Sequence, residues 1–287
     1  MKLSAPTLIG FIAILLWSCL ALFTAATGTI PPFELTAITF GISGVCGSLY
    51  ALFSGRLSVL RQPWKVWALG VGGLFGYHAI YFASLRLAPP AESGLIAYLW
   101  PLLIVLFSAL LPEEKLRWQH FIGAILGFSG VITLFLGKGN ALTLSGTSVK
   151  GYALALLCAF IWSGYSVLSR TVKQVPTLAV AGYCLVTAAL ALAASALFET
   201  MQPLHFDIQL LAATALGLGP LGFGFFAWDY GVKHGDIRLL GIAAFAAPVL
   251  STLILVATGY AAASWALALA CALIVGGAVV ATRQSQT

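Results

Sequence analysis

Charged residues are scarce in this sequence, and their scarcity excludes most soluble proteins. Only 8% of the 287 residues are charged, while 61% are hydrophobic. Soluble domains carry about 25% charged residues. The apolar runs are about twenty residues long, which suits membrane-crossing helices and is roughly twice the length of a strand in a membrane barrel. Such helices satisfy their own backbone hydrogen bonds in lipid. The composition therefore predicts an all-α polytopic membrane protein with no soluble domain.

Motifs for metal, disulfide or cofactor chemistry are also missing. The five cysteines lie singly in apolar runs without CxxC spacing, so we expect them to be buried packing residues. P-loop and HExxH motifs are absent, as are clustered carboxylate pairs other than Glu113-Glu114. These absences argue against an ATP-driven pump, and we expect neither a metal nor a cofactor. The net charge of +6 forms no basic cluster of the kind that binds nucleic acid.

Several glycine patterns predict close packing between helices. Residues 217–222 match the GxGxxG fingerprint of dinucleotide-binding folds, but that fingerprint needs a preceding strand and an open helix N-terminus. Here it falls inside an expected membrane helix and contains Pro220. The GxxxG pairs at residues 72–76 and 123–127 suit the same role, because small residues let two membrane helices approach closely.

Ten apolar runs are long enough to cross a bilayer as helices. Their predicted limits are residues 7–25, 33–53, 64–86, 92–111, 118–137, 150–171, 178–199, 208–232, 237–258 and 264–282. With the N-terminus inside, eleven of the fourteen Lys and Arg residues fall on the cytoplasmic side. Because cytoplasmic loops are enriched in Lys and Arg, we expect both termini in the cytoplasm.

Residues of the first half recur in the second half at nearly constant spacing. Trp17 recurs as Trp162, 145 residues later, and matches at a spacing of 147 continue through the later spans. The first apolar run resembles a secretory signal, but this recurrence predicts that it is retained as part of a repeat. Residues 1–140 and 141–287 are thus expected to form two five-span repeats of one transmembrane unit. Because five is odd, the second repeat is inverted, and such repeats place substrate at their interface near the midplane.

Aromatic residues and one histidine lie inside the spans, at depths where lipid-facing helices carry Leu or Val. A buried indole N–H or phenol O–H needs a partner, so these side chains either pack between helices or line a cavity. The repeat-related pair Trp17 and Trp162 favours a cavity. His78, an ionisable residue within a span, indicates a functional site by default unless it only bonds to a neighbouring helix. The candidate substrate-binding residues are Trp17, Tyr77, His78, Tyr81, Tyr98, Trp100, Trp162, Tyr165 and Trp228.

Two prolines and one carboxylate within the spans are candidates for a role in gating. Pro101 and Pro248 each remove a backbone hydrogen bond inside a helix and free the carbonyl four residues earlier, which is that of Ala244 for Pro248. Such a carbonyl needs another partner in lipid and can accept a hydrogen bond from a substrate's ammonium group. Asp229 lies four residues before Lys233. It either pairs with this lysine, whose amine then reaches the membrane surface, or acts in gating or proton coupling.

The ten spans in two halves, the prolines in spans four and nine, and the sequence ASLRLAPPAE at residues 83–92 together resemble the drug/metabolite transporter superfamily, specifically its EamA-type branch. The pair Glu113-Glu114 also resembles the acidic end of the fourth span in that family, although the second half has Tyr260-Ala261 there. The aromatic-rich interior is similar to the YddG-type bacterial aromatic amino acid exporters. This resemblance implies export of aromatic and other neutral amino acids across the inner membrane by alternating access.

We therefore expect a secondary exporter rather than an enzyme, with amino acids as substrate and the lipid bilayer as surroundings. The sequence predicts nothing about oligomeric state. Two alternatives remain. An exporter of the same fold for drugs or other metabolites is one, because an aromatic cavity with few fixed charges accepts lipophilic cations through cation–π contacts. The other is an intramembrane lipid-modifying enzyme, for which only Glu113-Glu114 offers a carboxylate cluster near the membrane surface.

Overall fold

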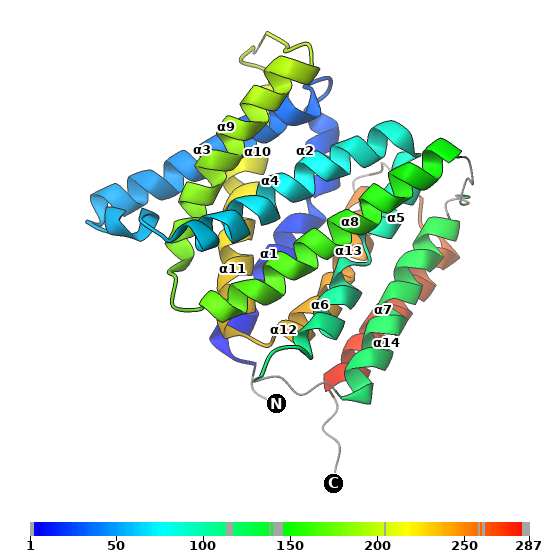
Figure 1. Ribbon diagram of the computed structural model, residues 1–287. Coiled ribbons are helices and arrows are strands. Elements are labelled where there is room, and N and C mark those ends of the chain that lie inside the picture. The colour runs from blue at the N-terminus through cyan, green and yellow to red at the C-terminus, as the bar shows by residue number, and fades with distance from the viewer. Residues whose placement is uncertain are drawn as a thin grey trace.

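The computed structural model describes residues 3–112, 117–137, 139, 146–203, 205–257, 259 and 262–282, and these residues form helices and short connections without strands (Figure 1). The helices are α1 Ala5–Ser18, α2 Leu20–Ala26, α3 Pro32–Phe53, α4 Trp64–Leu87, α5 Pro90–Ala97, α6 Trp100–Ser108, α7 Trp118–Gly137, α8 Gly146–Ser169, α9 Val180–Phe198, α10 Ile208–Leu218, α11 Gly224–His234, α12 Ile237–Ala244, α13 Ala246–Ala257 and α14 Trp265–Thr282. The prediction of an all-α fold is confirmed.

Nine helical segments of the described chain are long and apolar enough to cross a membrane, and the shorter apolar helix α14 occupies the tenth predicted span. The boundaries differ from the predicted ones by at most four residues, at the start of the segment Gly146–Val172. Large apolar side chains cover the outside of the bundle, including Phe53 at 85% and Leu197 at 76% exposure. Water would not tolerate so many exposed apolar side chains, whereas lipid does. The chain is therefore a multi-pass membrane protein.

Four of the spans are broken into two helices each. The breaks lie at Cys19 between α1 and α2, at Tyr98–Leu99 between α5 and α6, and at Phe245 between α12 and α13. A π-helical turn, Gly219–Phe223, separates α10 from α11. The breaks in the fourth and ninth spans lie just before Pro101 and Pro248, the two prolines of the gating hypothesis.

The sequence predicted that both prolines lie inside continuous helices, and the structure shows that they do not. Pro101 lies in the first turn of α6, and Pro248 is the third residue of α13. Proline is tolerated in a first helical turn, because the N–H that it lacks would have no partner within the helix there. Each proline therefore follows an existing break in the middle of its span.

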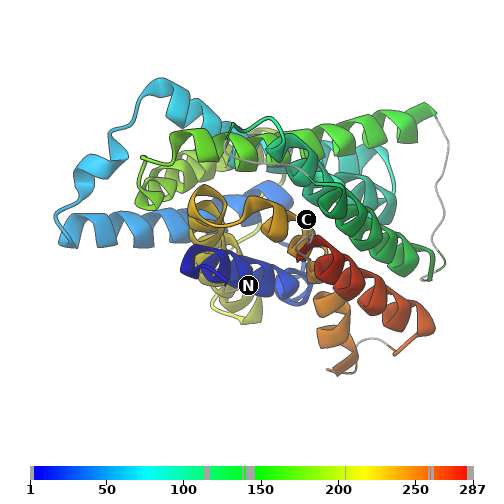
Figure 2. The same cartoon turned by 90° about the horizontal axis from the view of Figure 1, so that it is seen from below.

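Four helix pairs dominate the packing: α3 with α9, α7 with α14, α4 with α8, and α1 with α11. In every pair, one helix precedes residue 140 and the other follows residue 145. Figures 1 and 2 both show α7 and α14 side by side at one edge of the bundle. The beginning of α1 and the end of α14 lie toward the same end of the bundle (Figure 1).

Glycines bring several of these helices into close contact. A Cβ added to Gly123 of α7 would lie 2.6 Å from the carbonyl oxygen of Gly277 on α14, which confirms the packing role of the 123–127 pair. The 72–76 prediction is wrong for Gly72, which has no neighbour within 4 Å of an added Cβ. The packed face of α4 instead carries Gly70 and Gly73, because their spacing of three residues puts them on one side of the helix. The GxGxxG segment also packs closely: a Cβ on its first glycine would lie 2.8 Å from the carbonyl oxygen of Thr39 on α3.

Candidate functional site

A cavity of about 420 Å³ lies among the broken spans. This volume falls within the range of small-molecule sites, about 300–1,000 Å³. Its walls come from α1, α2, α4, α6, α8, α11, α13, the link before α6 and the π-helical turn. The lining residues are Trp17, Leu20, Ala21, Tyr77, His78, Tyr81, Tyr98, Trp100, Trp162, Leu221, Phe225, Ala247, Pro248 and Ser251. The structure thus brings seven of the nine predicted binding residues, and one of the two predicted gating prolines, to the wall of one cavity.

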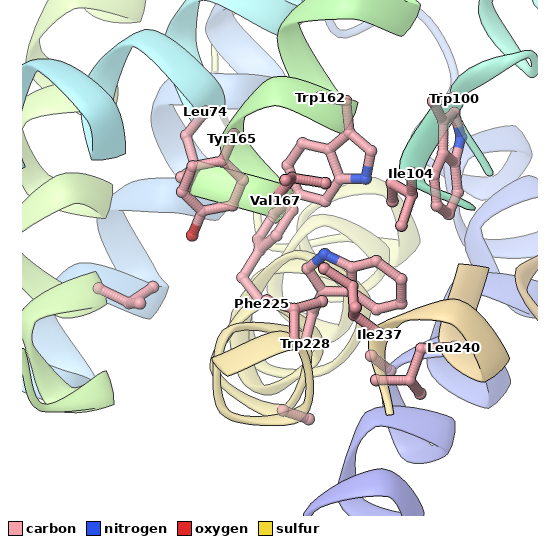
Figure 3. Packing of buried hydrophobic residues seen from close by; sticks show 14 of the residues in the cluster. Leu74, Trp100, Ile104, Trp162, Tyr165, Val167, Phe225, Trp228, Ile237 and Leu240 are labelled. Carbon is pink, nitrogen blue, oxygen red and sulfur yellow. The ribbon is translucent and has the colours of Figure 1, made fainter. Parts of the chain in front are cut away.

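Four aromatic residues form one part of the cavity wall, which we call the floor and define as Trp17, Trp100, Trp162 and Phe225. The ring of Trp17 lies 5.8 Å from that of Trp162 and 6.1 Å from those of Trp100 and Phe225, each in an edge-to-face arrangement. Edge-to-face pairs are the preferred geometry of aromatic rings. Trp100, Trp162 and Phe225 are buried, and Figure 3 shows these three side chains close together around Trp228. The floor is thus a closely packed aromatic surface.

The indole of Trp17 is also held by a hydrogen bond. Its Nε1 donates to the carbonyl oxygen of Pro220 at 3.0 Å. Pro220 belongs to the π-helical turn, whose backbone geometry differs from that of an α-helix and turns this carbonyl toward α1. The expected partner of a buried indole N–H is thus a backbone carbonyl of the eighth span, far away in sequence.

Two predicted lining residues, Tyr165 and Trp228, are absent from the cavity wall. Trp228 is completely buried behind the floor, 5.0 Å from the ring of Trp17, and its Nε1 donates to Ser166 Oγ at 3.0 Å. Tyr165 is 3% exposed, and its ring fills the notch at Gly73 on α4. Tyr165 lies one helical turn beyond Trp162, and its ring packs between α8 and α4. Both residues support the cavity from behind, so the structure corrects the prediction that they line it.

Besides the tryptophan indoles, polar groups in the cavity wall come from three tyrosines, one histidine and one serine. Tyr77 and Tyr81 stack on each other with ring centroids 5.9 Å apart. His78 Nδ1 lies 2.8 Å from the carbonyl oxygen of Leu74. Because a carbonyl can only accept, Nδ1 carries a proton, and Nε2 is the nitrogen that can meet a ligand. The structural interpretation of His78 expected a partner on a neighbouring helix, but Leu74 lies on α4 itself, and His78 also lines the cavity.

The carbonyl freed by Pro248 has a partner from the fourth span. Tyr98 Oη donates to the carbonyl oxygen of Ala244 at 2.8 Å. Tyr98 lies in the break between α5 and α6, and Ala244 is the last residue of α12 before the break at Phe245. The hydrogen bond thus joins the two broken spans at their breaks. The sequence predicted that this carbonyl would need a partner, but not that a tyrosine would supply it.

No Asp, Glu, Lys or Arg belongs to the described wall of the cavity. Asp229 and Lys233 pair with each other at 2.8 Å, and their side chains are 1% and 2% exposed. The expected pair exists, but the lysine does not reach the membrane surface. Both charges can be buried because each has a further hydrogen-bond partner. Thr177 Oγ1 donates to Asp229 at 2.7 Å, and Lys233 donates to the carbonyl oxygen of Val175 at 3.1 Å. Glu113 and Glu114 lie outside the described residues.

Metal ligands do not gather in the part of the chain that the structure describes. No group of three or more His, Cys, Asp or Glu side chains is close enough there to hold an ion. The lining residues that the sequence missed are mostly apolar: Leu20, Ala21, Leu221, Phe225, Ala247 and Ser251. Two of them had a usable signal: Phe225 is an aromatic residue inside a span, 147 residues after His78, and Ser251 lies one helical turn after Pro248.

Known proteins resemble this chain over almost its whole length. It is 57% identical over 284 residues to an aromatic amino acid exporter, YddG, of Ancylobacter novellus, with 98% of each chain covered. The aromatic amino acid exporter YddG of Escherichia coli K12 is 30% identical over 263 residues, with 86% of each chain covered. A solved crystal structure of 57% identity superposes with a TM-score of 0.94 over 98% of this chain and 97% of that chain.

The profile of the EamA-like transporter family matches residues 5–136 and again residues 149–283. Together these matches cover nearly all of the described spans. They confirm the family resemblance that the sequence showed. The sequence-based expectation of a transporter, rather than an enzyme, rested on that resemblance. The chain belongs to the EamA-like transporter family.

Proposed function

We propose that this protein is a secondary exporter of aromatic and other neutral amino acids, working by alternating access in the bacterial inner membrane. The observation that carries the proposal is the cavity, which has aromatic walls, contains no fixed charge among its described lining residues and lies in the middle of the broken spans. The relatives named as aromatic amino acid exporters support the substrate class. The partners are then the amino acid and the surrounding lipid.

The floor suits an aromatic or apolar side chain. Trp17, Trp162 and Phe225 present ring faces and edges to the cavity, and an aromatic pair adds about 0.5–1.5 kcal/mol beyond area burial. A neutral amino acid is a zwitterion, so its two charges need hydrogen-bonding groups but no fixed counter-charge. Tyr98 Oη and His78 Nε2 can accept hydrogen bonds from the ammonium group, because their protons are respectively donated to Ala244 and held on Nδ1. The hydroxyls of Tyr77, Tyr81 and Ser251 also line the cavity and can donate to the carboxylate. Weak binding of this kind allows the substrate to leave, as export requires.

The packing supports an inverted repeat of residues 1–140 and 141–287. The repeat relates α1 to α8 and α4 to α11, so it converts the α1–α11 pair into the α8–α4 pair, and both pairs are present. It also relates α3 to α9 and α7 to α14, and each of these helices packs against its own counterpart. Such contacts are expected around a two-fold axis in the membrane plane. The two matches of the family profile, one per half, add support.

The proposed orientation places both termini in the cytoplasm, because eleven of the fourteen Lys and Arg residues then lie on that side. In this orientation α2, α4 and α13 end on the periplasmic side. The cytoplasmic side would hold the end of α11 and the beginning of α12. A reporter enzyme fused to either terminus, active only in the cytoplasm, tests this arrangement.

An exporter of drugs or other metabolites is the alternative function. The absence of charged residues from the described cavity wall favours it equally, since aromatic rings bind lipophilic cations by cation–π contacts. Competition separates the two functions: a lipophilic cation that displaces amino acid flux completely, while being transported itself, would make the cation the substrate.

The proposal is tested by transport in liposomes containing the purified protein. Radiolabelled tryptophan, phenylalanine and threonine should show saturable flux that empty liposomes lack. Trp17→Ala should reduce this flux, because it opens the floor and removes the bond to Pro220. Trp118→Ala is the matched control, since Trp118 lies at the start of α7 with 67% exposure. Absence of flux for all amino acids would refute the substrate class.

A further inference from the structure

A buried ion pair lies outside the cavity, where α11 ends. Asp229 and Lys233 are both nearly inaccessible, and each is bonded to the connection between α8 and α9. Thr177 Oγ1 donates to Asp229 Oδ2 at 2.7 Å, and Lys233 Nζ donates to the carbonyl oxygen of Val175 at 3.1 Å. The pair itself lies within one helix. The contacts with Thr177 and Val175 therefore join α11 to the segment just before α9.

Further polar contacts hold the same end of the bundle together. The Arg170 guanidinium, just after α8, donates to the carbonyl oxygens of Val232 at 3.0 Å and Gly235 at 2.7 Å. Val232 lies in the last turn of α11 and Gly235 is the residue that caps it, and helix carbonyls at this end lack partners within the helix. Thr7 of α1 accepts a hydrogen bond from the backbone N–H of Asp236 at 2.9 Å. Figure 1 shows the ends of α8 and α11 and the beginnings of α1 and α12 gathered at this end.

The ion pair lies on the same helix as part of the cavity floor. Phe225 lines the cavity, Trp228 lies directly behind the floor, and Asp229 follows it. These residues are spaced three and four apart, so they share one side of α11. The helix is only 11 residues long, and the π-helical turn Gly219–Phe223 separates it from α10. A shift of α11 at the floor would therefore also move the ion pair.

We propose that Asp229 and Lys233 form a gate whose hydration favours opening of this end of the transporter. The inference rests on the proposed alternating-access function. When the end is closed, both charges are removed from water, and this desolvation is unfavourable. When it opens, water solvates them while the i,i+4 pair stays intact. The Thr177 and Val175 contacts oppose opening, because hydrogen bonds to charged groups are strong. The balance between hydration and these contacts sets how often the end opens.

This balance predicts opposite effects for two variants. Asp229→Leu combined with Lys233→Met removes both charges together with their contacts to Thr177 and Val175. Because the desolvation of two buried ions costs more than these contacts supply, the apolar replacements should keep the end closed. Thr177→Val removes the hydroxyl that binds the carboxylate, so the end should open more often. Thr171→Val is the matched control, because the Thr171 hydroxyl bonds locally to the Leu168 carbonyl at 2.7 Å in an exposed position.

Opening is measured with a single cysteine in a background without the five native ones. Ser169→Cys, at the end of α8, is 2% exposed and reports on the gate, whereas Ser251→Cys reports on the cavity. Both are labelled with a membrane-impermeant thiol reagent, from either face of oriented vesicles. At Ser169→Cys we expect labelling roughly tenfold slower in the apolar double variant and roughly tenfold faster in Thr177→Val. At Ser251→Cys labelling should change in the opposite direction.

Equal labelling rates in the folded variants and the wild type would overturn the proposal. Labelling at Ser169→Cys that changes in the same direction in the double variant and in Thr177→Val would also overturn it. Monodisperse elution in detergent identifies variants that are folded, and Thr177→Val tests the proposal even where the double variant does not fold. The labelling needs no substrate. Failure of amino acid transport would therefore refute the proposed function without obscuring the behaviour of the gate.

Discussion

Removing the Tyr98 hydroxyl should weaken the link between the two broken spans. In Tyr98→Phe the ring stays, but the carbonyl of Ala244 loses the donor that lies 2.8 Å away. Ala244 is completely buried, and Pro248 prevents the usual helical N–H from replacing the donor. An unsatisfied buried acceptor costs about 1–3 kcal/mol. At the upper end of this range the variant loses a substantial part of a typical stability of about 5–15 kcal/mol.

Two assays together test this reasoning. Thermal unfolding in detergent should show a lower Tm for Tyr98→Phe than for wild type, while Tyr50→Phe, at an exposed position, should leave it unchanged. Transport should show a higher KM if Tyr98 also meets the substrate. A wild-type Tm together with a wild-type KM would refute the reasoning, because it would mean that the Ala244 carbonyl is satisfied by other means and that the hydroxyl contacts no ligand.

Three further substitutions test the packing. Gly277→Ala should lower the Tm, because its Cβ would lie 2.6 Å from a backbone carbonyl of α7 and overpacking costs about 1–3 kcal/mol; Gly276→Ala, with nothing within 4 Å, should not. Glu199→Ala should destabilise the protein by about 0.5–2 kcal/mol, since its carboxylate accepts two backbone N–H bonds at the start of α3, and Glu199→Gln should have a smaller effect. Ser166→Ala should leave the Trp228 indole without its acceptor, at about 1–3 kcal/mol, measurable as a lower Tm and contradicted by an unchanged one.

The cavity was partly predictable because its residues are unusual for lipid. Trp17, Trp162 and His78 are out of place inside an apolar span, whatever the tertiary structure, and all three line the cavity. The same signal could not separate Trp162 from Tyr165. Both lie on α8, one turn apart, and the Gly73 notch on α4 takes the second ring out of the wall.

The burial of Lys233 was unpredictable for a related reason. A lysine near a helix end can reach the membrane surface along its flexible side chain, and nothing local prevents that. Here the connection between α8 and α9 covers the end of α11 and supplies the Val175 carbonyl as an acceptor. The helix breaks beside Pro101 and Pro248 likewise depend on neighbours, because a freed carbonyl permits a break only where another group satisfies it.

The sequence alone therefore determined the membrane class, the ten spans and the residue types available for a site. These depend on hydropathy summed over a window of about twenty residues, which needs no knowledge of neighbours. The tertiary structure alone decided which side of each helix faces the cavity, where the spans break and which charges are buried. Those outcomes depend on contacts between segments far apart in sequence, such as Trp17 with Pro220 and Tyr98 with Ala244. A sequence window within one helix never contains both partners of such a contact.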